Sequence, residues 1–162
     1  MNIIYVLVGG NMGNRRINLE TALSWLEKEI GNVNASSLIY ETEAWGNNDQ
    51  PDFYNQVHII HTRLSAEEAM KYILDIEEKM GRVRTIKNAA RIIDIDILFF
   101  NAAIINEPGL TVPHPEIANR RFVLVPLDEL SPGFVHPILH KTIHELLSTC
   151  KDELEVKPVS TS

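Results

Sequence analysis

The most informative stretch of the sequence is residues 92–100, which read Ile92-Ile93-Asp94-Ile95-Asp96-Ile97-Leu98-Phe99-Phe100. Isoleucine and phenylalanine favour strands, and no Gly or Pro interrupts the run. The composition therefore predicts a strand. Two aspartates inside such an apolar strand are unusual, because Asp is depleted in strands. They make this strand the starting point for both the fold and the function.

Five further elements precede this strand in the sequence. Residues 3–8 are β-branched and aliphatic and run into Gly9-Gly10, which predicts a buried strand that ends in a tight turn. Leucines and isoleucine then recur at helical spacing up to Gly31, which predicts the first helix. Residues 33–40 and 53–62 predict two more strands, separated by a loop rich in Gly, Asn, Asp and Pro.

A second helix is predicted from Ser65, where acidic residues occupy the first turn, to Gly81. The order strand, helix, two strands, helix, strand is that of a ferredoxin-like βαββαβ core. The predicted class is therefore α+β, with helices covering an antiparallel sheet. We expect one domain over residues 1–162, with a last helix at 142–150 and a polar, frayed tail at 151–162.

Composition excludes several classes of protein. With 44% hydrophobic and 23% charged residues and only eight Gly and eight Pro, the chain is neither collagen-like nor disordered. It has no apolar stretch of the length that a membrane span needs and no signal-peptide pattern, and its single cysteine, Cys150, permits no intrachain disulfide. We therefore expect a cytoplasmic protein. The net charge of −7 argues against binding to nucleic acid, and we expect a monomer that acts on small molecules.

Asp94 and Asp96 are two positions apart, so on a strand they share a face, with Cα atoms roughly 6.5 to 7 Å apart. Two carboxylates that converge in this way can hold a pair of Mg²⁺ ions beside a polyphosphate. The alternative is a solvent-facing half of an amphipathic strand. Against it, the same face continues with Leu98 and Phe100, and unpaired carboxylates beside apolar surface are costly.

The segment just before the strand, residues 81–91, is a local concentration of positive charge. Four of the chain's fifteen basic residues, Arg82, Arg84, Lys87 and Arg91, lie in it without any acidic residue. Guanidinium groups match phosphate oxygens in pairs, so the segment is typical of a polyphosphate clamp. A solvated basic loop that balances nearby acidic residues remains the alternative.

A second basic group follows at residues 112–122. His114 stands between two prolines, which restrict the backbone, and Arg120 and Arg121 follow shortly after. Such rigidity suits a placed hydrogen-bond donor, although a turn-forming histidine with surface arginines fits as well. No pairing of Ser or Cys with a base indicates a covalent nucleophile, so a direct transfer mechanism is favoured.

Several segments form a set of motifs that runs in order over roughly residues 3–127. They are Gly9-Gly10-Asn11, Tyr40-Glu41-Thr42, Asp49-Gln50-Pro51-Asp52-Phe53-Tyr54-Asn55, Gly81-Arg82-Val83-Arg84, Arg91-Ile92-Ile93-Asp94-Ile95-Asp96-Ile97-Leu98, Val112-Pro113-His114 and Asn119-Arg120-Arg121-Phe122. Together these motifs resemble a known family, the 6-hydroxymethyl-7,8-dihydropterin pyrophosphokinases of folate synthesis.

The resemblance implies an enzyme that transfers diphosphate from ATP to the hydroxymethyl group of the pterin and releases AMP. It further implies that Asp94 and Asp96 hold two Mg²⁺ ions and that Arg82 and Arg91 act in catalysis. Nucleotide contacts would come from Glu77, Arg84, His114 and Arg120, and the pterin pocket would be formed by Thr42, Trp45, Phe53, Asn55 and Phe122.

Two other functions compete with this one. A ferredoxin-like core also suits a non-catalytic module that binds a small ligand or mediates assembly, because one fold hosts many functions. Another Mg²⁺-dependent phosphotransferase would bind nucleotide without preferring a pterin. The paired carboxylates next to a basic segment favour an enzyme over the non-catalytic module.

Overall fold

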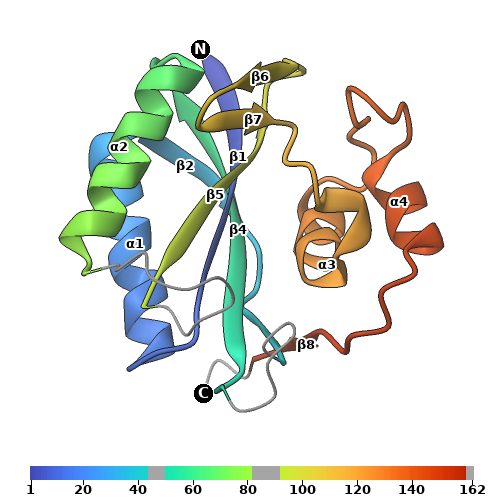
Figure 1. Ribbon diagram of the computed structural model, residues 1–162, viewed down its shortest axis with the longest axis horizontal. Helices are drawn as coiled ribbons and strands as arrows, with labels where there is room; N and C mark the ends of the chain where they lie inside the picture. The colour runs from blue at the N-terminus through green and yellow to red at the C-terminus, as the bar shows by residue number, and fades with distance from the viewer. Residues whose placement is uncertain (44–49, 82–91, 160–162) are drawn as a thin grey trace.

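A six-stranded antiparallel sheet forms the middle layer of the protein (Figure 1). The computed structural model describes residues 1–43, 50–81 and 92–159. The strands of the main path lie in the order β5 (Asp94–Phe100), β1 (Asn2–Gly10), β4 (Phe53–Thr62), β3 (Tyr40–Thr42) and β8 (Lys157–Pro158). β2 (Gly31–Ser36) also pairs with β4.

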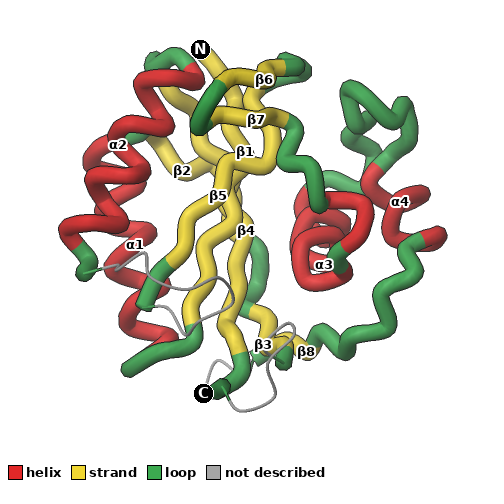
Figure 2. Tube along the Cα trace, viewed as in Figure 1, coloured by secondary structure: helices red, strands yellow, loops and turns green. Residues whose placement is uncertain are grey.

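Helices cover both faces of this sheet (Figure 2). α1 (Arg15–Glu29) and α2 (Ala66–Lys79) lie on one face, and α3 (Arg121–Leu130) and α4 (Ile143–Thr149) lie on the other. A small second sheet of β6 (Ile105–Glu107) and β7 (Leu110–Val112) and a short 3₁₀ helix, η1 (Ile117–Asn119), join β5 to α3. The protein is thus a sandwich with the sheet between two helical layers.

Alternation along β1 divides the core in two. Ile4, Val6 and Val8 pack with α1 and α2, whereas Tyr5 and Leu7 pack with α3 and α4. Successive side chains of a strand point to opposite faces, so a strand that is apolar at every position must be covered on both. This explains why residues 3–8 read as a continuous apolar run and confirms that the strand is buried on both faces.

The predicted ferredoxin-like α+β fold is confirmed. Strand, helix, two strands, helix and strand occur in the expected order. Of the two middle strands, the one predicted at 53–62 is β4, and the one predicted at 33–40 corresponds to parts of β2 and β3, which both pair with β4. α2 begins where the sequence predicts, because Ser65 Oγ accepts from Glu68 N (3.1 Å) and Glu68 Oε1 accepts from Ser65 N (2.9 Å). This reciprocal pair satisfies two of the amides that a helix leaves open at its start.

Two local predictions differ from the structure, and one helix was not predicted. Residues 33–40 form parts of two short strands, β2 and β3, rather than one. Gly9 and Gly10 belong to β1 and pair with Asn55 and Tyr54, so the strand continues through the expected turn. α3 was not among the predicted elements, and it contains Pro126, a residue that normally disfavours a helix interior.

The predicted fraying after residue 150 also differs from the structure over residues 152–159. β8 pairs with β3, and Val159 N donates to Ile39 O at 2.8 Å.

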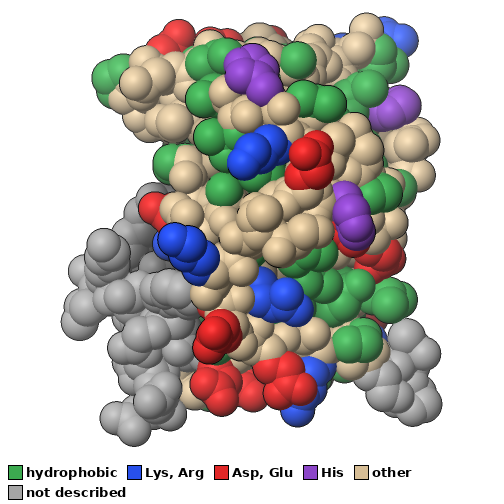
Figure 3. Space-filling view, turned by 90° about the vertical axis from the view of Figure 1, so that its right-hand side faces the viewer, with side chains coloured by type: hydrophobic (Ala, Val, Ile, Leu, Met, Phe, Trp, Pro, Cys, Tyr) green, Lys and Arg blue, Asp and Glu red, His purple; other side chains and the backbone are tan. Residues whose placement is uncertain are grey.

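Among the described residues, no helix combines the length and the apolar character that a membrane span requires. Figure 3 shows the side of the molecule that carries α3 and α4, where acidic and basic side chains are interspersed.

His58 is a titratable group buried in the sheet, and it makes the stability of the protein depend on pH. Its side chain is 0% exposed, Nδ1 lies 2.7 Å from Ser36 Oγ, and Nε2 has no hydrogen-bond partner among the described residues. Burial lowers the pKa of His58 to about 4, because the charged imidazolium loses its hydration. The folded protein therefore holds His58 neutral at pH 7.

Acid should consequently destabilise the fold through His58. The unfolded chain binds the proton near pH 6.5 and the folded chain only near pH 4, so stability is lost as pH falls through this window. The loss amounts to about 3 kcal/mol in total. Urea unfolding at several pH values should show this slope in the wild type and a flatter slope in His58→Gln. His61→Gln is the control, because His61 lies on the same strand but is partly exposed. An identical dependence of stability on pH in the wild type and in His58→Gln would contradict the assignment of this pH dependence to His58.

Candidate active site

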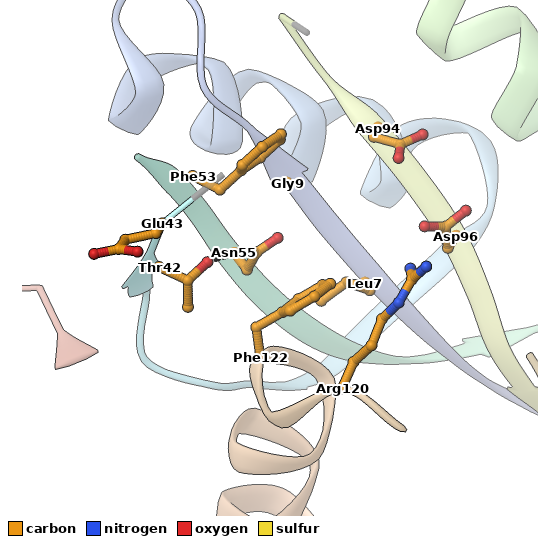
Figure 4. A pocket seen from close by; sticks show the side chains of 10 residues that line it. All are labelled: Leu7, Gly9, Thr42, Glu43, Phe53, Asn55, Asp94, Asp96, Arg120 and Phe122. Carbon is orange, nitrogen blue, oxygen red and sulfur yellow. Dashed lines mark hydrogen bonds between the residues drawn. The ribbon is translucent and has the colours of Figure 1, made fainter. Parts of the chain in front are cut away.

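One end of the sheet and the start of α3 enclose a pocket that collects most of the predicted site residues (Figure 4). The strands supply its floor and one side, and residues at the start of α3 supply the opposite side. Ten residues line it: Leu7, Gly9, Thr42, Glu43, Phe53, Asn55, Asp94, Asp96, Arg120 and Phe122.

Asp94 and Asp96 lie on β5 and line the same pocket. They pair with Gly9 and Leu7 of β1, while the intervening Ile95 is buried on the opposite face against α1 and α2. This is the arrangement that strand alternation predicts. Arg120 reaches from the start of α3 with its guanidinium directed toward Asp96 (Figure 4). The pocket thus combines two acidic groups with a cation from the facing helical layer.

Two aromatic rings and an amide form the other half of the pocket. Phe53 at the start of β4 and Phe122 in the first turn of α3 come from different layers (Figure 4). Between them lies Asn55, which is buried and whose Nδ2 donates to Thr42 Oγ1 at 3.4 Å. Flat heterocycles bind to aromatic faces and are oriented by fixed polar partners, so this half suits a planar ring with polar edges.

Gly9 makes room for Asn55. A Cβ atom at position 9 would collide with Asn55 Oδ1, so only glycine allows this amide to lie against β1. A glycine inside a strand often marks such a close approach. Gly9 therefore contributes to the pocket through its missing side chain, a role different from the turn that the sequence predicts.

The segment that carries Phe53 is anchored by contacts that the sequence analysis did not predict. Arg15 Nη1 donates to Glu41 Oε2 (2.8 Å) and to the Asp52 carbonyl oxygen (2.7 Å), and its guanidinium stacks on Tyr54, 3.9 Å from the ring centroid. Asn11 is buried and donates to the Pro51 carbonyl oxygen at 3.0 Å. These contacts anchor residues 51–54 to the start of α1.

A second pocket adjoins the first along β5 and contains His114. Asp96 lines both pockets. The other lining residues are Met70, Ile97, Gly109, Leu110, Thr111, His114 and Pro115. His114 was predicted from the sequence, but the apolar residues from α2 and β5 could not be assigned to it, because only the fold brings these elements together.

The protonation state of His114 follows from its surroundings. Burial, and then the charge of Arg120, lower the pKa of His114, against weaker opposing effects of Glu116 and Asp94. Its Nδ1 accepts from Glu116 N at 3.1 Å, so the single proton of the neutral ring resides on Nε2. His114 is therefore a neutral donor at pH 7, fixed beside a cis Val112–Pro113 peptide.

Glu77 is placed differently from His114 and Arg120. Its side chain is 3% exposed, its Oε2 accepts from Ile95 N at 2.8 Å, and it lines neither of the two pockets. The carboxylate thus bonds to the backbone of β5 between the two aspartates. Its contact in the structure is to the strand that carries Asp94 and Asp96.

Four predicted site residues lie outside the described residues: Trp45, Arg82, Arg84 and Arg91. The described residues on either side of segment 82–91 are close together, since a Cβ at Gly81 would lie 3.8 Å from Ile92 Cδ1. Ile92 is followed within two residues by Asp94. Gly81 and Ile92, the described residues that flank the basic segment, therefore lie side by side, and Ile92 belongs to the chain that leads into the aspartate pair.

The donor set suits a hard divalent cation that binds together with a phosphate substrate. Within the part of the chain that is described, no three His, Cys, Asp or Glu side chains converge as a closed metal cage. Mg²⁺ usually takes one or two protein carboxylates and completes its shell with phosphate oxygens and water. Asp94 and Asp96 in an open pocket fit that pattern.

Comparison with known proteins finds a family model and relatives that carry the same enzyme name. The family model described as 7,8-dihydro-6-hydroxymethylpterin-pyrophosphokinase matches residues 5–132. The 2-amino-4-hydroxy-6-hydroxymethyldihydropteridine pyrophosphokinase of Aquifex aeolicus is 35% identical, with 98% of this chain and 96% of the relative covered. The enzyme of the same name from Bacillus subtilis is 38% identical, with 80% of this chain and 78% of the relative covered.

Other relatives are much longer. The folic acid synthesis protein of Dictyostelium discoideum is 38% identical over 90% of this chain, which spans only 22% of that protein. A crystal structure of Plasmodium falciparum HPPK-DHPS superposes with a TM-score of 0.73 at 22% identity, covering 91% of this chain and 43% of the other. The chain thus spans about a fifth of the curated folic acid synthesis protein, and the superposition confirms the fold. By the family match and the full-length similarity to the Aquifex protein, the chain belongs to the 7,8-dihydro-6-hydroxymethylpterin-pyrophosphokinase family.

Proposed function

We propose that the protein transfers diphosphate from ATP to the hydroxymethyl group of 6-hydroxymethyl-7,8-dihydropterin in folate synthesis. The pterin oxygen attacks the β-phosphorus, and the bond between that phosphorus and the oxygen bridging to the α-phosphate breaks. The products are AMP and the pterin diphosphate, and the hydroxyl proton is released. We propose that the protein acts as a monomer, which is supported by the origin of both carboxylates and both aromatic walls in one chain.

One observation carries the proposal: Asp96 lines both the aromatic pocket and the pocket that contains His114. A transfer between two bound molecules requires their reacting atoms to meet at one place. A pterin between the aromatic rings and a nucleotide beside His114 would meet at the aspartate pair. This geometry supports group transfer over simple binding of one ligand.

The pterin half of the pocket has a role for each side chain. Phe53 and Phe122 would stack on the two faces of the ring, and Asn55 would bond its amide edge. Thr42 fixes the Asn55 amide through the 3.4 Å hydrogen bond. Trp45, from the segment that follows Glu43, is proposed to complete the wall.

The nucleotide half is proposed to lie along β5 and β7. Met70, Ile97 and Leu110 give an apolar surface for adenosine, and His114 Nε2 and Arg120 would donate to phosphate oxygens. We propose that Arg82, Arg84 and Arg91 contact the phosphates from the basic segment. Donors placed in advance stabilise the charge that spreads over the phosphate oxygens in the transition state.

Asp94 and Asp96 are the residues that would hold Mg²⁺, for which we propose two ions. When bound, the ions neutralise part of the charge of the ATP phosphates. The protein residues then align the pterin hydroxyl with the phosphorus and exclude water, which competes as an acceptor.

The test is an assay of AMP formation from ATP and Mg²⁺, with and without the hydroxymethyl pterin. AMP should appear in equal amount to the pterin consumed and only when the pterin is present. Formation of ADP, or AMP formation at the same rate without pterin, would contradict the proposed reaction. A ligand-binding module would bind a non-hydrolysable ATP analogue without strict need for Mg²⁺ and produce no AMP.

His114 gives a separate prediction for the nucleotide half. His114→Ala should raise the KM for ATP roughly tenfold, because a hydrogen bond to a charged group is lost. His114→Gln, which keeps an N–H donor near the position of Nε2, should recover part of the loss. The pterin KM should stay nearly constant in both variants. Equal ATP KM values for wild type and His114→Ala would show that the imidazole does not contact the nucleotide.

A further inference from the structure

The first turn of α3 carries part of the pocket but has no capping side chain of its own. Phe122 lies in this turn, and Arg120 is the N-cap residue, whose side chain makes no capping hydrogen bond. The turn contains no acidic residue, and Arg120 and Arg121 place two cations at its start. Cations are unfavourable there, because the helix dipole is positive at this end. The turn therefore depends on a partner from elsewhere.

That partner is Asp152, which follows α4 in the sequence. Its Oδ2 accepts from Arg121 N at 3.0 Å, so a carboxylate 31 residues away takes the place of the missing cap. Its Oδ1 accepts from Leu154 N at 3.0 Å, and the Leu154 carbonyl oxygen accepts from Arg121 Nε at 3.3 Å. The negative charge also offsets the two cations at the start of the helix.

The same segment continues to the opposite wall of the pocket. Residues 151–159, here called the C-terminal strap, run from α4 past α3 to β8 (Figures 1 and 2). β8 pairs with Tyr40 and Glu41 of β3, the strand that ends with the pocket residue Thr42. The strap thus joins the α3 wall to the β3 wall. It also lies beyond residue 132, where the match to the family model ends.

We propose that Asp152 is a positioning residue that holds Phe122 ready for the pterin, an inference that rests on the proposed function. Without the carboxylate, the first turn of α3 loses its acceptor and its compensating charge and frays. Binding must then order Phe122 at a cost in affinity. Asp152 itself does not line the pocket with Phe122. Its effect is exerted through α3.

The experiment compares three variants of the full chain. Asp152→Ala removes the acceptor, Asp152→Asn keeps an acceptor of the same length without the charge, and Glu153→Ala removes a carboxylate from the adjacent exposed position of the strap. The KM values for pterin and for ATP are measured in the AMP assay, together with amide hydrogen exchange in the first turn of α3. Asp152→Ser replaces Asp152→Ala should the latter not fold.

Asp152→Ala should raise the pterin KM roughly fivefold, the effect expected from loss of a helix cap. The ATP KM should rise less than the pterin KM, because Arg120 at the N-cap is next to the turn whereas His114 lies outside it, and exchange at the start of α3 should accelerate. Asp152→Asn should recover most of the affinity, since Asn caps helices about as well as Asp, and Glu153→Ala should match the wild type.

Two results would overturn the inference while leaving the proposed function intact. One is an unchanged pterin KM in Asp152→Ala. The other is an equal rise of the KM for pterin and the KM for ATP in this variant, which indicates general loss of structure. Failure of the wild type to form AMP in the presence of pterin is a different result, since it removes the proposed function and this inference with it.

Discussion

Asp94→Ala and Asp96→Ala are each expected to lower the kcat of pterin-dependent AMP formation roughly a thousandfold. Both carboxylates line the pocket where the two substrates are proposed to meet, and either substitution removes a ligand for the divalent cation. The loss should appear in kcat, because the interaction acts on the charge that develops during transfer.

The fold should survive both substitutions, since the aspartates lie on the open pocket face of β5 rather than in the hydrophobic clusters. Melting temperature and circular dichroism check this. Asp75→Ala is the matched control: it removes an exposed aspartate on α2 that pairs only at the surface with Lys79, 2.9 Å away. Near-normal AMP formation by both β5 variants would defeat the assignment of the site.

Phe53→Ala and Phe122→Ala are expected to raise the KM for the pterin roughly ten- to a hundredfold. Stacking of an aromatic side chain on a heterocyclic base contributes about 1–3 kcal/mol, and each substitution removes one face of the proposed sandwich. The ATP KM should be almost unaffected in Phe53→Ala, because this ring does not line the pocket of His114. In Phe122→Ala the ATP KM should rise less than the pterin KM, since the Arg120 guanidinium lies over this ring, 5.8 Å from its centroid.

Aromatic replacements separate stacking from simple loss of volume. Phe122→Tyr keeps the ring face and should retain most of the affinity for the pterin. Phe122→Leu keeps only apolar volume, so its pterin affinity should lie between those of Phe122→Tyr and Phe122→Ala. Direct titration with the pterin in the presence of Mg²⁺ and a non-hydrolysable ATP analogue gives the same ranking without turnover. Equal pterin affinities for Leu, Tyr and Phe at position 122 would mean that the ring does not stack on the substrate.

The order of the elements in the βαββαβ core could be predicted because each of these elements carries a local signal. The apolar run of β1 and the capping box at Ser65 and Glu68 each involve residues that are close together in the sequence. The same holds for Asp94 and Asp96, which lie on one face of β5 because side chains alternate along a strand with a period of two residues. At these positions the short-range patterns agree with the structure, whereas the turn predicted at Gly9-Gly10 and the single strand predicted at 33–40 do not.

Features that depend on distant residues could not be predicted. Asp152 caps a helix that begins 31 residues earlier, and no local pattern links the two. Glu77 bonds to Ile95 across 18 residues, and Arg15 reaches Glu41 across 26. Such contacts exist only after the sheet has formed, so they are properties of the fold rather than of any segment.

The division of the predicted strand at 33–40 has a similar origin. β2 and β3 both pair with β4, but the chain leaves the strand path at Ser37, whose backbone N donates to the Val57 carbonyl oxygen at 2.9 Å. Its hydroxyl in turn accepts from Val57 N at 3.0 Å. A serine side chain that bonds to a neighbouring strand replaces a regular ladder contact, which composition alone does not reveal.

The most direct test of the account is a crystal structure of the protein with Mn²⁺, a non-hydrolysable ATP analogue and the hydroxymethyl pterin, with the metal located by anomalous scattering. The account predicts metal bound by oxygens of both Asp94 and Asp96, with the pterin ring between Phe53 and Phe122. Metal bound away from these two carboxylates, or a pterin outside the aromatic pocket, would contradict it.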